Sequence, residues 1–215
     1  MTKAKQEAMQ FKIVLNYSSP RIWRRILVPK ECTFFALHCA IQDAMGWTDT
    51  HLQWFCFDRR GQSKPVDRRI DDLTYIEYPN PEIDYSDRES LDETKEHVAD
   101  WLPIIAKQCI YEYDFGDSWQ HTVLFERAVF VEEGTLPRCV AGKGACPPED
   151  CGGIGGYIDL QHILKDPKDP EHADMMDWLG FDDPSEFRPL DFDPMDVEFT
   201  DPEKRLKSYR EGFGR

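Results

Sequence analysis

The chain has 215 residues, 40% of them hydrophobic and 13% aromatic, and a formal net charge of −15 at pH 7. This length and apolar content suit one domain with a hydrophobic core, whereas the acidic balance disfavours direct binding to a nucleic-acid backbone, which needs a basic face. No run of about 18 apolar residues is present and residues 1–10 lack an apolar signal core, so we expect neither a membrane span nor a secretion signal. Seven cysteines are an odd number in a chain too long to depend on disulfides, which indicates a reduced, cytoplasmic protein.

The first residues predict an antiparallel pair of strands. Apolar and polar side chains alternate over residues 11–17 and again over 21–29, and Ser18-Ser19-Pro20 between them has the composition of a turn. Arg24 and Arg25 offer a place for an anion, although a solvated strand face is the interpretation we favour. Basic residues are concentrated in this first third of the chain: Arg21, Arg24, Arg25, Lys30, Arg59, Arg60, Lys64, Arg68 and Arg69.

A helix is predicted over residues 34–45. Thr33 is a good N-cap, Gly46 suits the position just after the helix, and apolar residues between them share one helical stripe. His38 lies on that stripe, and we expect a satisfied core histidine there rather than a ligand. A third strand is predicted over residues 51–58, in the middle of the sheet because it is apolar on both faces near its end.

The following region is charged. Residues 59–72 predict a turn or loop. Residues 75–100 are rich in Asp and Glu and poor in large aliphatic side chains, which predicts an acidic, partly mobile surface excursion with a helix over residues 92–101.

A tight β-hairpin is predicted next. Residues 110–115 alternate between aromatic and acidic side chains, Gly116-Asp117-Ser118 has turn chemistry, and residues 119–131 alternate again. Four polar or aromatic residues lie within a few positions of its tip: Asp114, Asp117, Trp119 and His121.

Two interpretations of this tip remain open. In one, a carboxylate holds His121 in a fixed tautomer for proton transfer or metal binding. In the other, Asp114 and Asp117 satisfy backbone amides of the turn, and His121 is a half-buried strand residue with one hydrogen bond. We favour the second interpretation, because structural turns of this kind are far commoner than active sites.

A second unusual stretch follows over residues 139–157. Pro147-Pro148-Glu149-Asp150 predicts an extended segment, and the four glycines after it permit turns that other residues cannot make. A long ordered loop of this composition indicates binding or a neighbouring element to cover. The stretch has neither the Walker spacing nor the dinucleotide-binding fingerprint.

Three cysteines in this stretch allow a zinc site as one interpretation. Cys139, Cys146 and Cys151 could complete a tetrahedral set with His121 if the hairpin tip lay over the loop. The interpretation we favour is that they are small buried cysteines that behave as hydrophobic residues.

The C-terminal part predicts helices. A short one is expected over residues 157–164, another opens at Asp169-Pro170-Glu171 and closes at Gly180, and Asp183-Pro184-Ser185-Glu186 repeats the start signal. Residues 201–215 form a charged C-terminal tail with a final helix around 202–211.

Several of these strings resemble the plasmid pRiA4b ORF-3-like family over residues 8–200. The resemblance implies an α+β fold in a single domain, with an antiparallel β-sheet and packed helices, as the element pattern also predicts. It implies little about function: members are often encoded on plasmids and mobile elements, some carry the label TnpR resolvase, and some are fused to a repressor-like DNA-binding domain. We locate neither an activated serine among arginines nor a basic DNA-binding tail here. The matching strings are Ile22–Ile26, Leu37–Gln42, Met45–Trp47, His51-Leu52, Tyr111–His121, Cys146–Asp150, Gly152-Gly153, Gly156-Tyr157, Trp178–Gly180 and Phe187.

Our leading functional hypothesis is a binding module for a protein or small-molecule ligand, associated with plasmids or mobile elements. Its site would be a cleft between hairpin and loop, with Trp119 as an apolar wall. The candidate residues are Asp114, Asp117, Trp119, His121, Glu149 and Asp150.

Two alternatives are kept. One is a metal-assisted hydrolase or nuclease that uses His121, Asp117, Glu149 and Asp150 on a magnesium or manganese ion. The other is a DNA-associated regulatory protein that binds through the basic first third, although the net charge argues against a nucleic-acid partner.

Overall fold

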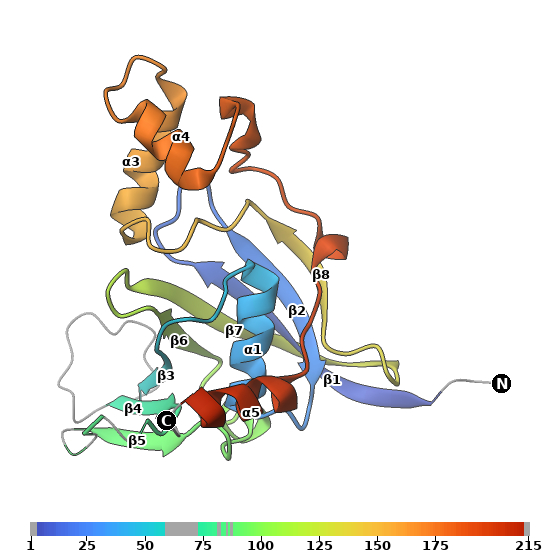
Figure 1. The fold of residues 1–215 in the computed structure, drawn as a ribbon. Helices are drawn as coiled ribbons and strands as arrows, with labels where there is room; N and C mark the ends of the chain where they lie inside the picture. The colour runs from blue at the N-terminus through green and yellow to red at the C-terminus, as the bar shows by residue number, and fades with distance from the viewer. Residues whose placement is uncertain (1–3, 59–72, 81–82, 85, 87, 213–215) are drawn as a thin grey trace.

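The computed structural model describes residues 4–58, 73–80, 83–84, 86 and 88–212 (Figure 1). The turn or loop expected over 59–72 lies outside these residues. The described chain forms one α+β domain around a single eight-stranded sheet, in the order β5-β4-β3-β6-β7-β1-β2-β8. The single-domain α+β prediction is therefore confirmed. The sheet is mixed, because β4 and β5 run parallel while every other neighbouring pair is antiparallel.

The strands come from all but the last third of the chain. They are β1 (Lys5–Leu15), β2 (Trp23–Pro29), β3 (Gln53–Asp58), β4 (Leu73–Glu77), β5 (Glu89–Asp92), β6 (Gln108–Tyr113), β7 (Trp119–Glu132) and β8 (Arg138–Lys143). The β1–β2 pair and the β6–β7 hairpin were both predicted and are confirmed. β8 was not predicted; it extends the sheet by pairing with β2.

The helix α1 (Phe34–Met45) covers one face of the sheet (Figure 1). The Thr33 side chain accepts a hydrogen bond from the Ala36 amide, and Gly46 ends the helix in the left-handed conformation at φ 100°. Its apolar stripe packs on the inward side of the sheet, where the Phe34 ring contacts Phe55 and Phe57 of β3. Phe11, Phe34 and Leu37 are fully buried in one core. The predicted helix and both of its ends are confirmed.

The expected surface excursion over 75–100 is corrected in part. β4 and β5 lie in this region and continue the sheet beyond β3, and every residue of β4 is buried. The expected helix is only α2 (Val98–Trp101). The acidic composition suggested a solvent-exposed segment. Glu77 is nevertheless buried in β4, because its carboxylate accepts hydrogen bonds from Arg88 and Ser90.

The C-terminal third is helical. Its elements are α3 (Gly153–Lys165), α4 (His172–Leu179), the 3-10 turns η2 (Pro184–Glu186) and η3 (Pro194–Asp196), and α5 (Pro202–Gly212). α3 starts within the glycine run that we expected to be a loop. The cause is close packing: a Cβ on Gly156 would lie 1.7 Å from the carbonyl oxygen of Cys151, so only glycine fits this first helical turn.

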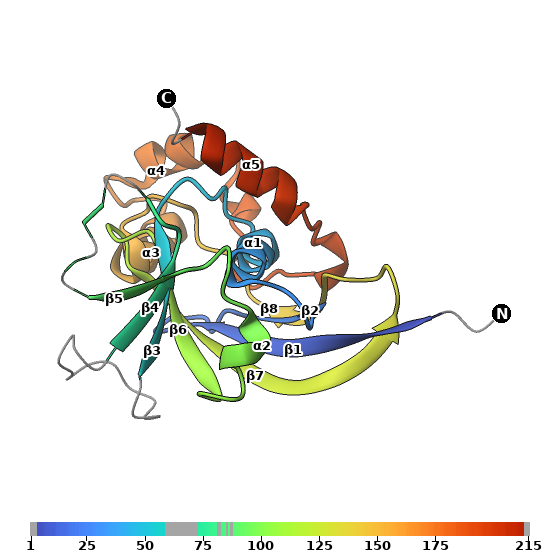
Figure 2. The ribbon, with the colours of Figure 1, turned by 90° about the horizontal axis from the view of Figure 1, so that it is seen from below.

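Figure 2 shows α1, α3, α4 and α5 all on one side of strands β1 and β7. Among the described residues, none of the helices combines the length and the apolar character that a bilayer span requires.

Candidate functional site

The hairpin tip and the Pro-Pro-Glu-Asp loop meet in the structure. The Asp117 carboxylate accepts a hydrogen bond from the Gly152 amide at 3.2 Å, and Gly153 lies against the backbone carbonyl of Asp117. Glu149 accepts hydrogen bonds from the Tyr113 hydroxyl at 2.6 Å and from the amide and hydroxyl of Thr48. The carboxylates of Asp117 and Glu149 therefore connect the hairpin to the loop and are engaged in hydrogen bonds within the protein.

Trp47 fills the space where we expected a cleft. Its ring stacks on Tyr113 at 5.2 Å between centroids and contacts Trp119 and His121 at 5.6 and 5.3 Å. Its indole N–H donates to the Pro147 carbonyl at 3.1 Å. Trp119 and His121 lie behind it with 0% exposure, so the expectation that they line an open cleft is corrected.

His121 is more deeply buried than either interpretation of the hairpin tip assumed. Among the described residues, no side chain forms a hydrogen bond with either ring nitrogen. Burial lowers the pKa of His121 to about 3, against a smaller opposing effect of the backbone at Trp119 and Tyr111. The residue is therefore a neutral member of an aromatic core. No carboxylate among the residues that the structure describes contacts the ring to hold the fixed tautomer proposed for proton transfer.

The zinc set that the sequence left open as an alternative is not assembled in the described structure. In the described part of the chain, one group of at least three His, Cys, Asp or Glu side chains gathers its ligand atoms closely enough for a metal, and it contains none of Cys139, Cys146, Cys151 and His121. Burial raises the pKa of the Cys151 thiol to about 12 and that of Cys146 still further. Such pKa values favour the protonated thiol. The prediction of small buried cysteines holds in part, because Cys139 is buried whereas Cys146 and Cys151 are half-buried.

The group that does gather consists of His51, Asp114 and Asp150, whose ligand atoms all lie within 4.8 Å of one another. His51 Nε2 is 3.2 Å from an oxygen of Asp150 and 3.8 Å from Oδ2 of Asp114. Asp114 and Asp150 were predicted site residues, and the structure brings them together across the hairpin and the loop. His51 was missed, because it precedes β3 and lies far from both in sequence; its one signal was the His51-Leu52 string of the resemblance.

Left-handed backbone positions at Asp114 and Asp150 accompany the approach of both carboxylates to His51. Asp114 takes the left-handed conformation at φ 56°, and its Oδ1 accepts from the Gly116 amide at 2.9 Å, which leaves Oδ2 to face His51. Asp150 is also left-handed, at φ 58°. Asp114 is buried while the Asp150 side chain is 70% exposed, so the group opens to solvent on the Asp150 side.

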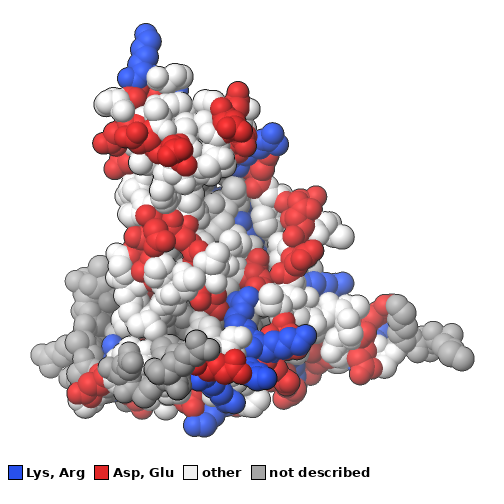
Figure 3. Space-filling view, viewed as in Figure 1, with Lys and Arg blue, Asp and Glu red and all other residues white. Residues whose placement is uncertain are grey.

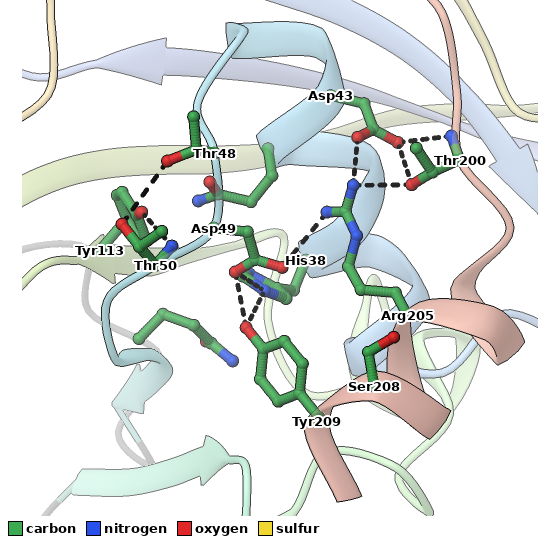
Figure 4. A network of polar contacts seen from close by, with 12 residues as sticks. His38, Asp43, Thr48, Asp49, Thr50, Tyr113, Thr200, Arg205, Ser208 and Tyr209 are labelled. Atoms are coloured by element: carbon green, nitrogen blue, oxygen red, sulfur yellow. Dashed lines mark hydrogen bonds and ion pairs between the residues drawn. The ribbon is translucent and has the colours of Figure 1, made fainter. Parts of the chain in front are cut away.

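A second polar network lies between α1 and α5 (Figure 4). His38 pairs with Asp49 at 2.8 Å and contacts the Tyr111 hydroxyl at 2.9 Å, and the Tyr209 hydroxyl donates to Asp49 at 2.6 Å. Burial alone would raise the pKa of Asp49, but His38, Tyr209 and Arg205 together hold it below its ordinary value. The prediction of His38 as a satisfied core histidine is confirmed, and α5 covers it.

Arg24 has a structural role. It is 1% exposed, its guanidinium donates to the Ala44 carbonyl at 2.7 Å and lies over the Phe192 ring at 3.6 Å, and burial lowers its pKa to about 10. Arg24 is therefore not available to a nucleic-acid backbone. Arg25 is bound by Glu126 at 2.6 Å.

Comparison with known proteins agrees with this fold. Residues 7–200 match the family described as plasmid pRiA4b ORF-3-like protein. The chain is 34% identical over 176 residues to the uncharacterized protein y4hQ of Sinorhizobium fredii (strain NBRC 101917 / NGR234), with 81% of this chain and 82% of that one covered. The crystal structure of the protein of unknown function MM3350 from Methanosarcina mazei Go1 matches with a TM-score of 0.74 and 35% identity, covering 90% of this chain and 99% of that one. The chain belongs to the plasmid pRiA4b ORF-3-like family.

Proposed function

We propose that this protein is a binding module whose site holds a divalent cation between His51, Asp114 and Asp150. The observation that carries the proposal is the convergence of one imidazole and two carboxylates from three separate segments, within 4.8 Å. A cation there would offset the repulsion between two carboxylates and give His51 Nε2 an electron-pair acceptor.

The ligand types favour zinc or manganese over magnesium. Imidazole nitrogen together with carboxylate oxygen suits zinc and other transition metals, whereas magnesium prefers oxygen ligands alone. Three protein ligands would leave further coordination positions on a bound ion. The 70% exposure of the Asp150 side chain supports access to them from solvent. A small molecule or a partner side chain would complete the coordination from that side.

The hydrolase alternative has less support from the geometry. Two of its four residues, Asp117 and Glu149, are occupied by the Gly152 amide and the Tyr113 hydroxyl, and a third, His121, is buried behind Trp47. We therefore propose binding of the cation and no turnover.

Titration calorimetry of the chelator-treated protein with zinc and with manganese tests this function. We expect one ion per chain, and affinity at least tenfold weaker in His51→Gln and in Asp150→Asn, since each removes one ligand atom. The control is Asp191→Asn, which removes a carboxylate of similar exposure, 68% against 70%, away from the group. No binding, or binding unchanged in both site variants, would contradict the proposal.

A further inference from the structure

The sheet face turned away from α1 carries a groove of about 760 Å³ over strands β1, β2, β7 and β8. Its lining combines aliphatic side chains such as Leu124 and Val129 with four basic residues, Arg25, Lys107, Arg127 and Arg138, and one acidic residue, Glu126. The helices α1, α3, α4 and α5 lie on the other side of the sheet in Figure 2, and none of them covers it.

Most of the positive charge in this groove is free to meet a ligand. Glu126 is engaged by Arg25 through two hydrogen bonds of 2.6 and 2.7 Å. In the part of the chain that the structure describes, Lys107, Arg127 and Arg138 make no ion pair; Arg127 contacts the amide oxygen of Gln10 at 3.3 Å. Three exposed cations therefore face one groove, and no carboxylate among the described residues pairs with them.

This local excess of positive charge is opposite in sign to the net charge of the chain. The chain as a whole carries −15. On the helix-bearing face in Figure 3, acidic side chains spread over α3, α4 and the segment that leads to α5. Four basic residues and one acid around this groove reverse the charge balance of the chain, which has 26 basic and 41 acidic residues. Such a local reversal steers a negatively charged partner to this face.

The apolar part of the groove indicates what kind of partner fits. Phe130 is 69% exposed and Val140 is 38% exposed at its border. Exposed apolar side chains that lie together mark interaction sites, and aromatic residues and Arg are enriched in protein–protein interfaces. Phe130, Arg127 and Arg138 give this groove that composition.

A nucleic-acid strand fits this surface less well. Unspecific strands bind by stacking their bases on flat aromatic rings that lie open in a basic groove. Here the lining holds two aromatic rings among aliphatic and charged side chains. Phe125 is held edge-on against Phe11, with centroids 5.7 Å apart and planes at 67°, and Phe130, at 69% exposure, is the one ring of the lining that lies open. The groove thus offers a single open stacking surface, whereas its aliphatic side chains and cations offer several contacts to the apolar side chains and carboxylates of a peptide.

We propose that this groove docks an acidic amphipathic segment of a partner protein. Its apolar side chains would lie on Leu124, Val129 and their neighbours, and its carboxylates would pair with Lys107, Arg127 and Arg138. This site is separate from the cation site and does not depend on it, so it can be tested in the presence of a metal chelator.

The test begins with a library of random 12-residue peptides displayed on phage and selected on the full-length protein in chelator-containing buffer. We expect the enriched peptides to alternate Asp or Glu with Leu, Ile, Val or Phe. The two strongest are then synthesised, and their affinities are measured by fluorescence anisotropy. Arg127→Ala with Arg138→Ala should weaken them at least tenfold.

The matched control removes two exposed cations elsewhere, Lys204→Ala with Lys207→Ala on α5, and should leave the affinity unchanged. Charge exchange gives the sharper readout: Arg138→Glu should abolish binding, and replacing one peptide Glu by Lys should restore at least part of it. Because Arg127 and Arg138 are exposed, these variants should melt at the temperature of the unaltered protein.

Three outcomes would overturn the proposal: no enriched peptides, enriched peptides without acidic residues, or binding that survives the double replacement. An oligonucleotide of twelve thymidines that binds more tightly than the peptides, and is lost in the same variant, would show a nucleic-acid site instead.

Discussion

At the scale of single residues, burial determines which side chains of the hairpin can take part in a site. Trp119 and His121 lie fully inside, behind Trp47, while Asp114 directs one oxygen outward to His51. The sequence predicted Asp114 and Asp150 as site residues because both flank unusual turns. It did not predict His51, whose proximity results from pairing of β3 with β6, a long-range contact that local patterns do not contain.

The buried His121 predicts a pH dependence of stability. Its pKa falls from 6.5 to about 3 on folding, so the unfolded chain takes up a proton first as the pH falls. The stability it contributes is complete above pH 6.5 and is lost progressively as the pH falls toward 3. His121→Phe should therefore reduce the loss in free energy of unfolding between pH 7 and pH 4.5, measured by urea denaturation.

The exposed His162 on α3 provides the control, and His162→Phe should leave that loss as it is. An acid loss of equal size in His121→Phe and in the unaltered protein would show that His121 is not the responsible group.

At the scale of elements, local signals predicted α1, the β1–β2 pair and the β6–β7 hairpin, because caps, turn residues and alternation act within a few positions. They failed for β4, whose acidic Glu77 is neutralised by a partner from outside the strand. Local signals also failed for the start of α3. Its glycines suggested a loop, but Gly156 and Gly153 pack closely against the backbone of Cys151 and Asp117.

Two neighbouring glycines of α3 should respond in opposite ways. Gly156→Ala places a Cβ on the Cys151 carbonyl and should lower the free energy of unfolding by roughly 2–4 kcal/mol. Gly155 has no atom within 4 Å of a Cβ, and Gly155→Ala should stabilise by up to about 1 kcal/mol through helix propensity. Urea denaturation measures both; equal effects would contradict the packing argument.

Ion pairs of Arg205 connect the helix α5 to Asp43 and Asp49. Arg205 pairs with Asp43 at 2.5 Å and with Asp49 at 3.3 Å, and both carboxylates are buried. Arg205→Met should lower the free energy of unfolding by roughly 3 kcal/mol, because it leaves buried carboxylates short of a partner. Lys207→Met, at a position 79% exposed on the same helix, should change it by less than about 0.5 kcal/mol. A similar effect of both changes in thermal or urea unfolding would argue against this anchor.

At the scale of the whole molecule, the two sheet faces have different chemistry. One is covered by helices, and acidic side chains spread over α3, α4 and the segment that leads to α5. The proposed cation site lies where hairpin, loop and the residues before β3 meet. The other carries the basic groove. Composition alone predicted an acidic domain with a core, but the net charge hid this separation, because it depends on which strands become neighbours.

The most direct test of the central claim is the position of a bound metal ion. Crystals soaked in zinc and measured at the zinc absorption edge should show one anomalous peak between His51 Nε2, Asp114 Oδ2 and the nearest oxygen of Asp150, and the peak should vanish in His51→Gln. A crystal with no peak there, or with zinc held by Cys139, Cys146 and Cys151 instead, would contradict the account.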